Sequence, residues 1–231
     1  MYSIYDKNPI LIKNMSELII FDLDNTLLAG DSDRNWGIFL CEQNVVKKDY
    51  LEESEKFYNN YYDGSLDIDG FLAFCLKPLI SNDMRVLNNL RRKFIDEKIR
   101  PIMTSKGMDE INLAKKNNQT VIIATATNDF VTRPIADLFG VDTLIATEFE
   151  TIENCFTGNI VGIPCFREGK LQKVTKWAKK NNFDLSEATF YTDSFNDLPL
   201  LQKVKYPIIV DGDDKLKVIG ERNNWKCMSF R

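Results

Sequence analysis

The chain has 231 residues, of which 44% are hydrophobic, and its net charge is −4. This length can bury a full hydrophobic core and suits one catalytic domain with a modest insertion. Because acidic and basic residues alternate along the chain, its composition gives no support to an extended nucleic-acid surface.

The composition also restricts location and chemistry. The apolar runs are well short of the roughly 20 residues that span a bilayer, and the N-terminus lacks the apolar core of a secretory signal. We therefore expect a cytoplasmic protein with no membrane partner. The five cysteines are odd in number and scattered, as is typical of free thiols in a reducing compartment. Since there is no histidine, carboxylates and lysine must carry any catalysis.

The first clear element is a strand that ends in two carboxylates. Residues 1–15 are mostly polar and are treated as peripheral, but the apolar run 18–21 leads directly into Asp22 and Asp24. Strands of a parallel sheet are buried on both faces, and ligands gather beyond their carboxyl ends. Two like charges there are costly unless a cation or a shared proton compensates, so the pair predicts a metal site. The alternative is that one aspartate only caps the next helix.

A helical region follows this strand. Gly30 breaks the regular structure, and Asp31 can cap the helix after it. Helical spacing without strand alternation then extends over 33–43, 45–62, 66–77, 82–99 and 102–117. We predict a mostly helical insertion at 30–117, between core segments 1–29 and 118–231. Its aromatic residues are expected to be mostly core.

Strands and helices alternate after the insertion. Strands are predicted at 120–124, 141–147, 188–192 and 206–210, with a hairpin or irregular loop near 155–164 and a helix from about 169 to 182. Strands alternating with helices imply a parallel, doubly wound sheet with right-handed crossovers. The predicted fold class is therefore α/β, a Rossmann-like core with an inserted helical domain.

Polar groups follow three of these strands and begin one helix. Beyond Asp22 and Asp24, they are Thr125, the amide of Ala126, Lys170, Asp193, Asn196 and Asp197. An all-oxygen donor set favours Mg²⁺, which binds through few carboxylates and a substrate phosphate. A hydroxyl, amide N–H groups and an ammonium can bind the other phosphate oxygens. A carboxylate can also attack phosphorus to form an aspartyl-phosphate.

Each of these residues also has a plainer interpretation. Lys170 alone would be a solvated lysine in the first turn of a helix. Thr125 would be a strand-end hydroxyl that bonds to the backbone, and Asn196 would be the N-cap of the following helix. Only the combination of motifs favours the catalytic interpretation.

The motifs Asp22-x-Asp24-x-Thr26, Thr125, Lys170 and Asp193-x-x-x-Asp197 resemble, in order and sheet context, the four motifs of the haloacid dehalogenase superfamily of phosphohydrolases. The resemblance covers nearly the whole chain. The helical insertion is similar to the cap of the phosphoserine-phosphatase-like subfamily.

This resemblance implies a role for each motif residue. Asp22 would be the nucleophile, and Asp24 the general acid that protonates the leaving group and then activates water. The remaining roles are phosphoryl binding by Thr125 and Lys170, Mg²⁺ binding by Asp193 with Asp22 and the Asp24 carbonyl, and phosphoryl contact and support of the site by Asn196 and Asp197.

Asp31 is the candidate residue for selecting the substrate. It lies nine residues after Asp22, where the phosphoserine phosphatases that this motif resembles carry an acidic residue that meets the substrate ammonium. Those enzymes hold the substrate carboxylate with a cap arginine, but the helix expected at 66–79 has only Lys77 as a cation. An amine-bearing phosphomonoester without a carboxylate, such as histidinol phosphate, fits both observations better than phosphoserine. The alternative is that Asp31 only caps a helix.

The sequence therefore predicts a Mg²⁺-dependent phosphatase that acts on a small phosphorylated metabolite through an aspartyl-phosphate. One alternative is a phosphotransferase that uses the same intermediate. Another is a non-catalytic phosphate-binding module, which would lack motif residues, and none is missing here. A receiver-like regulatory domain would be much shorter and would lack the insertion. The oligomeric state is left open.

Overall fold

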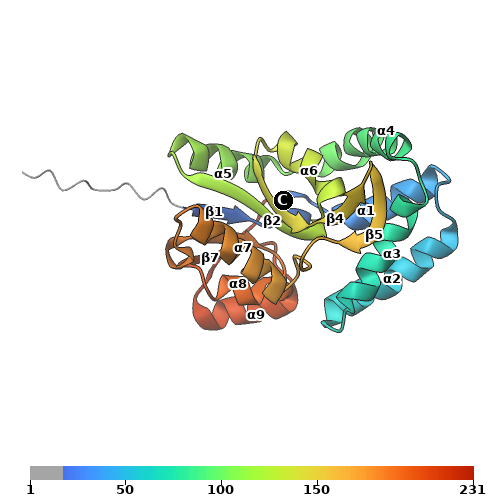
Figure 1. The fold of residues 1–231 in the computed structure, drawn as a ribbon. Coiled ribbons are helices and arrows are strands. Elements are labelled where there is room, and N and C mark those ends of the chain that lie inside the picture. Colours follow the sequence, from blue (N-terminus) through green and yellow to red (C-terminus); the bar gives the residue numbers. More distant parts are fainter. Residues whose placement is uncertain (1–17) are drawn as a thin grey trace, which may run out of the picture.

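The computed structural model describes residues 18–231, and a six-stranded sheet lies at its centre (Figure 1). The strand order is β3-β2-β1-β6-β7-β8, and all neighbouring strands run parallel. The strands are β1 (Leu18–Phe21), β2 (Thr120–Asn128), β3 (Thr143–Thr147), β6 (Thr189–Thr192), β7 (Tyr206–Val210) and β8 (Lys226–Met228). The predicted α/β class is confirmed. The prediction for residues 1–15 lies outside the described residues.

Helices cover both faces of this sheet. They are α1 (Ser32–Glu42), α2 (Lys48–Asp63), α3 (Ile68–Ile80), α4 (Met84–Phe94), α5 (Ser105–Lys116), α6 (Asp129–Leu138), α7 (Glu168–Lys180), α8 (Leu198–Leu201) and α9 (Asp214–Asn223). Figure 1 shows α5 and α6 above the sheet and α7, α8 and α9 below it. Among the described residues, no helix is long and apolar enough to cross a membrane.

The central strand β1 explains why the sheet is buried on both faces. Ile19 and Phe21 pack in one hydrophobic core with α1 to α6, and Leu18 and Ile20 pack in the other with α7 to α9. Because successive side chains of a strand point to opposite faces, only a continuous apolar run satisfies both cores. The same apolar run directs Asp22 to the carboxyl edge of the sheet.

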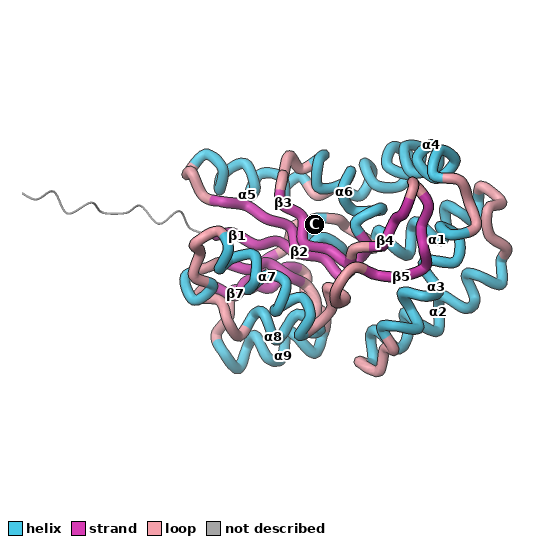
Figure 2. The backbone as a smooth tube through the Cα atoms, in the orientation of Figure 1, coloured by secondary structure: helices cyan, strands magenta, loops and turns pink. Residues whose placement is uncertain are grey.

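The helical segments predicted between β1 and β2 are present. Helices α1 to α4 gather beside the sheet, together with an antiparallel hairpin of β4 (Phe149–Ile152) and β5 (Cys155–Ile160) that contacts α3 (Figure 2). Helix α5 instead contacts β2, and Thr104 before it donates to the Leu27 carbonyl at 2.8 Å. The boundaries of the insertion, 30–117, remain a prediction.

Strands β2, β4 and β8 differ from the sequence prediction, and β4 lies before the segment 155–164 where a hairpin or irregular loop was expected. Strand β2 was expected to end at Ala124, but it continues to Asn128 with an irregular register against β3 in between. This irregularity places three further residues at the sheet edge. Strand β8 was not predicted, because its three residues are an edge strand with no apolar alternation, and its pairing with β7 depends on long-range contacts.

Aromatic packing joins the helices beside the sheet to the sheet domain. The rings of Trp36 and Phe94 meet edge to face at 5.1 Å, and Phe39 lies 5.7 Å from Phe94. Trp36 also contacts Phe130 of α6 at 6.1 Å. Since Phe94 is fully buried, its ring is a main link between α4 and the rest of the core.

We predict that Phe94→Ala lowers the free energy of unfolding by about 3–5 kcal/mol, because it removes a buried ring and leaves a cavity. Val86→Ala, an exposed position in the same helix, should change it by less than about 0.5 kcal/mol. Urea unfolding followed by tryptophan fluorescence measures both. Equal small effects would show that this cluster does not hold the helices.

Candidate active site

The carboxyl ends of β1, β2 and β6 surround one cavity at the point where the strand order reverses, which is where parallel α/β sheets bind ligands. Every residue that the sequence singled out for the site lines this cavity: Asp22, Asp24, Asp31, Thr125, Ala126, Lys170, Asp193, Asn196 and Asp197. They come from segments up to 175 residues apart, between Asp22 and Asp197. Convergence of these groups makes this cavity the candidate active site.

A buried ion cluster lies at its base. The Nζ atom of Lys170 donates to Asp22 Oδ1 at 2.9 Å and to Asp197 Oδ2 at 2.8 Å. Lys170 and Asp197 are each 3% exposed and Asp22 is 6% exposed. The solvated-lysine interpretation of Lys170 is therefore wrong, because α7 directs its side chain inward to the carboxylates.

The electrostatics of this cluster follow from its burial. Burial raises the pKa of Asp22 to about 7; Lys170 opposes this, and the charges of Asp197 and Asp24 add to it. Burial alone would lower the pKa of Lys170, but Asp197 and Asp22 hold it well above its ordinary value. Lys170 is therefore a permanent cation in the site.

In the part of the chain that the structure describes, Asp24 accepts hydrogen bonds from three donors, the longest of which comes from the Thr125 hydroxyl at 3.5 Å. The backbone N–H of Ser32 donates to Asp24 Oδ1 at 2.6 Å, and the hydroxyl of Thr127 donates to Asp24 Oδ2 at 2.8 Å. Burial and the charge of Asp31 raise the pKa of Asp24 to about 7, although both hydrogen bonds lower it. Such a carboxyl can hold a proton near neutral pH and release it. The sequence did not single out Thr127, which reaches Asp24 because β2 extends past Ala124.

Thr125 both lines the site and bonds to the backbone, so the ligand-binding and structural interpretations of its hydroxyl are compatible. It lines the cavity, and its hydroxyl oxygen accepts from the backbone N–H of Thr127 at 3.2 Å. The next residue, Ala126, is held by its carbonyl, which accepts from Thr147 at 2.9 Å. These bonds fix the irregular part of β2 against β3 beside the carboxylates.

Asp193 follows β6 and lines the same cavity. Its Oδ1 accepts from the hydroxyl of Thr26 at 3.1 Å. Burial and the charges of Asp22 and Asp197 hold its pKa well above its ordinary value. A cation between Asp22 and Asp193 would relieve this repulsion.

The donor set fits Mg²⁺ rather than a softer metal. In the described part of the chain, no group of three or more histidine, cysteine, aspartate or glutamate side chains is arranged around a metal position. An ion here would have two carboxylates, those of Asp22 and Asp193, with the carbonyl of Asp24. Mg²⁺ commonly binds through so few protein ligands and keeps several waters.

Asn196 contacts the helical region above the site. Its Oδ1 accepts from Arg167 Nε at 2.9 Å, and its Nδ2 donates to the Tyr61 carbonyl at 3.4 Å. The N-cap interpretation of Asn196 is wrong, because Ser194 caps the short turn that follows β6. Sequence alone gave no signal for Arg167, which also donates to the Gly64 carbonyl at 2.8 Å.

These bonds close the end of α2 over the site. The Tyr61 hydroxyl lies 2.9 Å from Ser194 Oγ, and Lys215 donates to the carbonyls of Tyr62 and Asp63. The cavity that remains has a volume of about 60 Å³. Ligand pockets usually measure about 300–1,000 Å³, so this cavity is smaller than those that hold a whole phosphorylated metabolite.

The helical region contributes acidic and aromatic side chains to the cavity. Asp31 caps α1 by accepting from the Arg34 N–H at 2.8 Å, and it also lines the cavity, so capping and ligand contact are compatible. Lys77 is turned outward and pairs with Glu53 at 3.0 Å. Among the residues that line the cavity, Lys170 is the one lysine or arginine.

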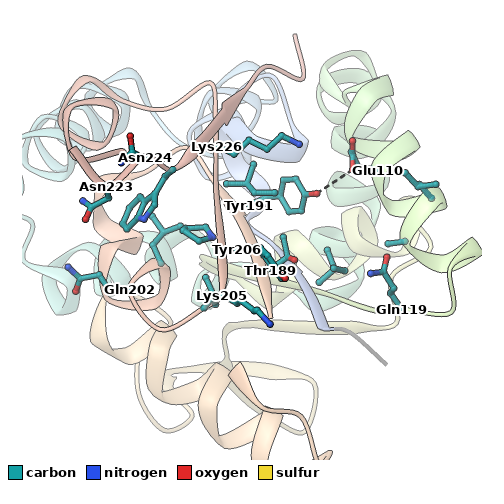
Figure 3. Close-up of a pocket in the computed structure, with 18 of the residues that line it drawn as sticks. Glu110, Gln119, Thr189, Tyr191, Gln202, Lys205, Tyr206, Asn223, Asn224 and Lys226 are labelled. Carbon is teal, nitrogen blue, oxygen red and sulfur yellow. Dashed lines mark hydrogen bonds between the residues drawn. The ribbon is translucent and has the colours of Figure 1, made fainter. Parts of the chain in front are cut away.

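A larger cavity of about 910 Å³ lies near the amino-terminal ends of β6, β7 and β8 (Figure 3). The hydroxyl of Tyr191 donates to Glu110 across it at 3.3 Å. None of the residues singled out by the sequence lines it. Size alone therefore does not identify the site, and the converging carboxylates do.

Comparisons with known proteins agree on one family. Residues 19–202 match the model of the haloacid dehalogenase-like hydrolases. A histidinol-phosphatase of Neisseria meningitidis is 35% identical over 222 residues, 94% of this chain and 100% of the relative. A solved protein of unknown function from Bordetella pertussis is similar, with a TM-score of 0.86, 33% identity, and coverage of 94% and 100%. A substrate-bound phosphoserine phosphatase shares the fold at a TM-score of 0.69, with 18% identity and 92% of each chain covered.

We predict that Lys170→Met lowers the free energy of unfolding by about 3–5 kcal/mol near neutral pH, because two buried carboxylates lose their cation. The pKa of Asp22 is about 7 in the folded state and 3.8 ordinarily, so between these values the folded protein holds a proton that the unfolded chain releases. Stability therefore falls as the pH rises through this window, and losing Lys170 deepens the fall. The deficit should be largest at about pH 8 and should shrink toward about pH 5.

Lys176→Met is the matched control, because Lys176 is an exposed lysine of the same helix, α7. It should cost less than about 1 kcal/mol at either pH. Urea unfolding at both pH values gives the comparison. A deficit in Lys170→Met that does not depend on pH would contradict the account of the ion cluster.

Proposed function

The chain belongs to the haloacid dehalogenase-like hydrolases, and from this we propose that it is a Mg²⁺-dependent phosphatase that hydrolyses a small phosphomonoester through an aspartyl-phosphate on Asp22. One observation carries the proposal. Asp22 is buried beside the permanent cation Lys170, within a cavity that it shares with a second carboxyl, Asp24, of suitable pKa.

Asp22 is the nucleophile in this proposal. Lys170 holds its Oδ1, so Oδ2 is the oxygen that attacks phosphorus. A bond forms between this oxygen and phosphorus, and the bond from phosphorus to the leaving oxygen breaks. Water then attacks the aspartyl-phosphate, which releases phosphate and restores the carboxylate.

Asp24 moves the proton. It donates a proton to the leaving oxygen in the first step and accepts one from the attacking water in the second. A carboxyl with a pKa near the working pH does both efficiently, and that of Asp24 is about 7. The bonds from Ser32 and Thr127 fix its two oxygens, so its direction toward the leaving group is set before substrate arrives.

The remaining residues bind the phosphoryl group and the metal. Lys170, the Thr125 hydroxyl and the Ala126 amide supply donors to phosphoryl oxygens. Asn196 Nδ2 has a second N–H besides the one that donates to the Tyr61 carbonyl, and Asp197 keeps Lys170 in place. Asp22, Asp193 and the Asp24 carbonyl would hold Mg²⁺, which neutralises negative charge on the phosphoryl group when bound.

The leaving group is proposed to carry an amine, as in histidinol phosphate. Asp31 offers a carboxylate in the cap half of the cavity, and a buried charge is favourable only if it is paired. A carboxylate on the substrate would lack a partner, because Lys77 is turned outward to Glu53. Phosphoserine therefore fits less well. The name of the Neisseria meningitidis relative agrees with this substrate class.

We place the protein in the cytoplasm. All five of its cysteines are free, which suits a reducing compartment.

We predict that Asp22→Asn abolishes turnover, whereas Asp24→Asn keeps the nucleophile and loses a proton-transfer contribution of roughly 10²–10⁴ in kcat. The loss in kcat/KM, which reports formation of the aspartyl-phosphate, should be greater for alkyl phosphates than for p-nitrophenyl phosphate, whose leaving group needs no proton. The loss in kcat should affect both substrates, because they share the hydrolysis of the intermediate. Steady-state kinetics on both substrates measure this. Turnover by Asp22→Asn, in protein shown by mass spectrometry to contain no regenerated aspartate, would rule out covalent catalysis at this residue.

We also predict that millimolar Mg²⁺ raises Tm of the wild-type protein, because ligand that binds only the folded state stabilises it. Asp193→Asn should fold and lose this response, since it removes one of the two carboxylates. Thermal unfolding with Mg²⁺ and with EDTA measures it without any substrate. Full phosphatase activity after exhaustive chelation would defeat the metal assignment.

A further inference from the structure

Besides Asp31, the helical region contributes a second carboxylate to the cavity. Asp33 lies in the first turn of α1 and lines the same cavity as the proposed nucleophile. The Tyr58 hydroxyl donates to its Oδ2 at 3.0 Å, and the Cys75 thiol donates to the same oxygen at 3.5 Å. Within the described residues, both donors reach Oδ2, which leaves Oδ1 available to a ligand.

Asp31 and Asp33 differ in their structural roles. Asp31 accepts the N–H of Arg34 and thereby caps α1, so part of its role is structural. Asp33 caps nothing. Its two partners, Tyr58 and Cys75, carry no positive charge, so they orient the carboxylate and leave its charge unbalanced.

The charge of the whole cavity favours a cationic leaving group. Its lining holds six aspartates and one lysine: Asp22, Asp24, Asp31, Asp33, Asp193, Asp197 and Lys170. A Mg²⁺ ion adds two positive charges, and a phosphoryl group adds further negative charge. Since buried charges must be paired, positive or N–H-bearing groups on the leaving group would complete the balance.

The surfaces around Asp33 suit a flat ring. Four aromatic side chains of the helical region line the cavity with Asp33, and Phe166 before α7 lines it as well: Phe57, Tyr58, Tyr61, Phe71 and Phe166. Aromatic faces stack on planar rings and attract cations. A carboxylate among such faces is complementary to a planar heteroaromatic ring with an N–H at its edge.

We propose that Asp33 is a specificity-determining residue that accepts a hydrogen bond from a ring N–H of the leaving group, so that the preferred substrate carries both an amine and a nitrogen heteroaromatic ring on a short phosphorylated chain. In this arrangement Asp31 meets the amine and Asp33 meets the ring. This inference rests on the proposed function, because the ring belongs to the leaving group of the phosphomonoester that Asp22 attacks.

Two substrates isolate the ring contact. Histidinol phosphate and phenylalaninol phosphate share the phosphate and the amine, and only the first has a ring N–H. The wild-type protein should prefer histidinol phosphate in kcat/KM. Asp33→Asn should lower this preference by about 10- to 100-fold, because the ring N–H then meets a neutral amide in place of a charged acceptor. Asp31→Asn should lower kcat/KM for both substrates alike and leave the preference unchanged.

Two further variants serve as controls. Asp69→Asn, an exposed aspartate on α3, should change neither substrate. Tyr58→Phe removes a donor that orients Asp33 and should weaken the preference less than Asp33→Asn does. If Asp33→Asn fails to fold, the substrate preference is measured in Tyr58→Phe instead. A preference equal to that of the wild-type protein overturns the proposal.

Binding of the dephosphorylated products separates this inference from the proposed function. Calorimetry of wild-type protein and Asp33→Asn with histidinol and phenylalaninol requires no turnover. A preference for histidinol that Asp33→Asn loses supports the role of Asp33, even if no phosphomonoester is hydrolysed and the proposed function fails. If the wild-type protein hydrolyses histidinol phosphate but Asp33→Asn affects both substrates equally, the proposed role of Asp33 is overturned and the proposed function stands.

Discussion

The buried contact of Lys170 with Asp22 and Asp197 is the interaction on which the rest of the site depends. Removing two carboxylates from water is costly, and a single ammonium at 2.8–2.9 Å offsets only part of that cost. Burial, with the excess of negative charge added to it, raises the pKa of Asp22 and Asp24 toward neutrality, and this excess makes the carboxylates ready to bind a cation. The protein remains folded despite this electrostatic cost because the large apolar cores on both faces of the sheet stabilise the chain elsewhere.

Two parts of the chain contribute different residues to the cavity. Because β1 and β6 are neighbours at the reversal of strand order, the residues that follow them meet without any long loop. In the proposed mechanism these residues bind the phosphoryl group. The helical region supplies Asp31, Asp33 and most of the aromatic side chains of the cavity, which are proposed to contact the leaving group. A change of cap residues can therefore alter the substrate while the phosphoryl chemistry is kept.

The sequence predicted what depends on local pattern. The apolar run of β1 followed by two aspartates indicated both the buried strand and the site, and the alternation of strands and helices indicated the sheet. It did not predict Thr127, Arg167 or the role of Asp33, because their contacts depend on an irregular strand register and on partners 25 to 103 residues away. The alternative that Asn196 is only an N-cap fails because Ser194, two residues earlier, caps the turn instead.

The most direct test of the account is to trap the intermediate. Asp24→Asn protein mixed with radiolabelled substrate and quenched in acid should retain label, since hydrolysis of the aspartyl-phosphate lacks its general base. Peptide mapping should place this label on Asp22, and Asp22→Asn protein should retain none. Label on another residue, or no covalent label while phosphate is still released, would contradict nucleophilic catalysis by Asp22.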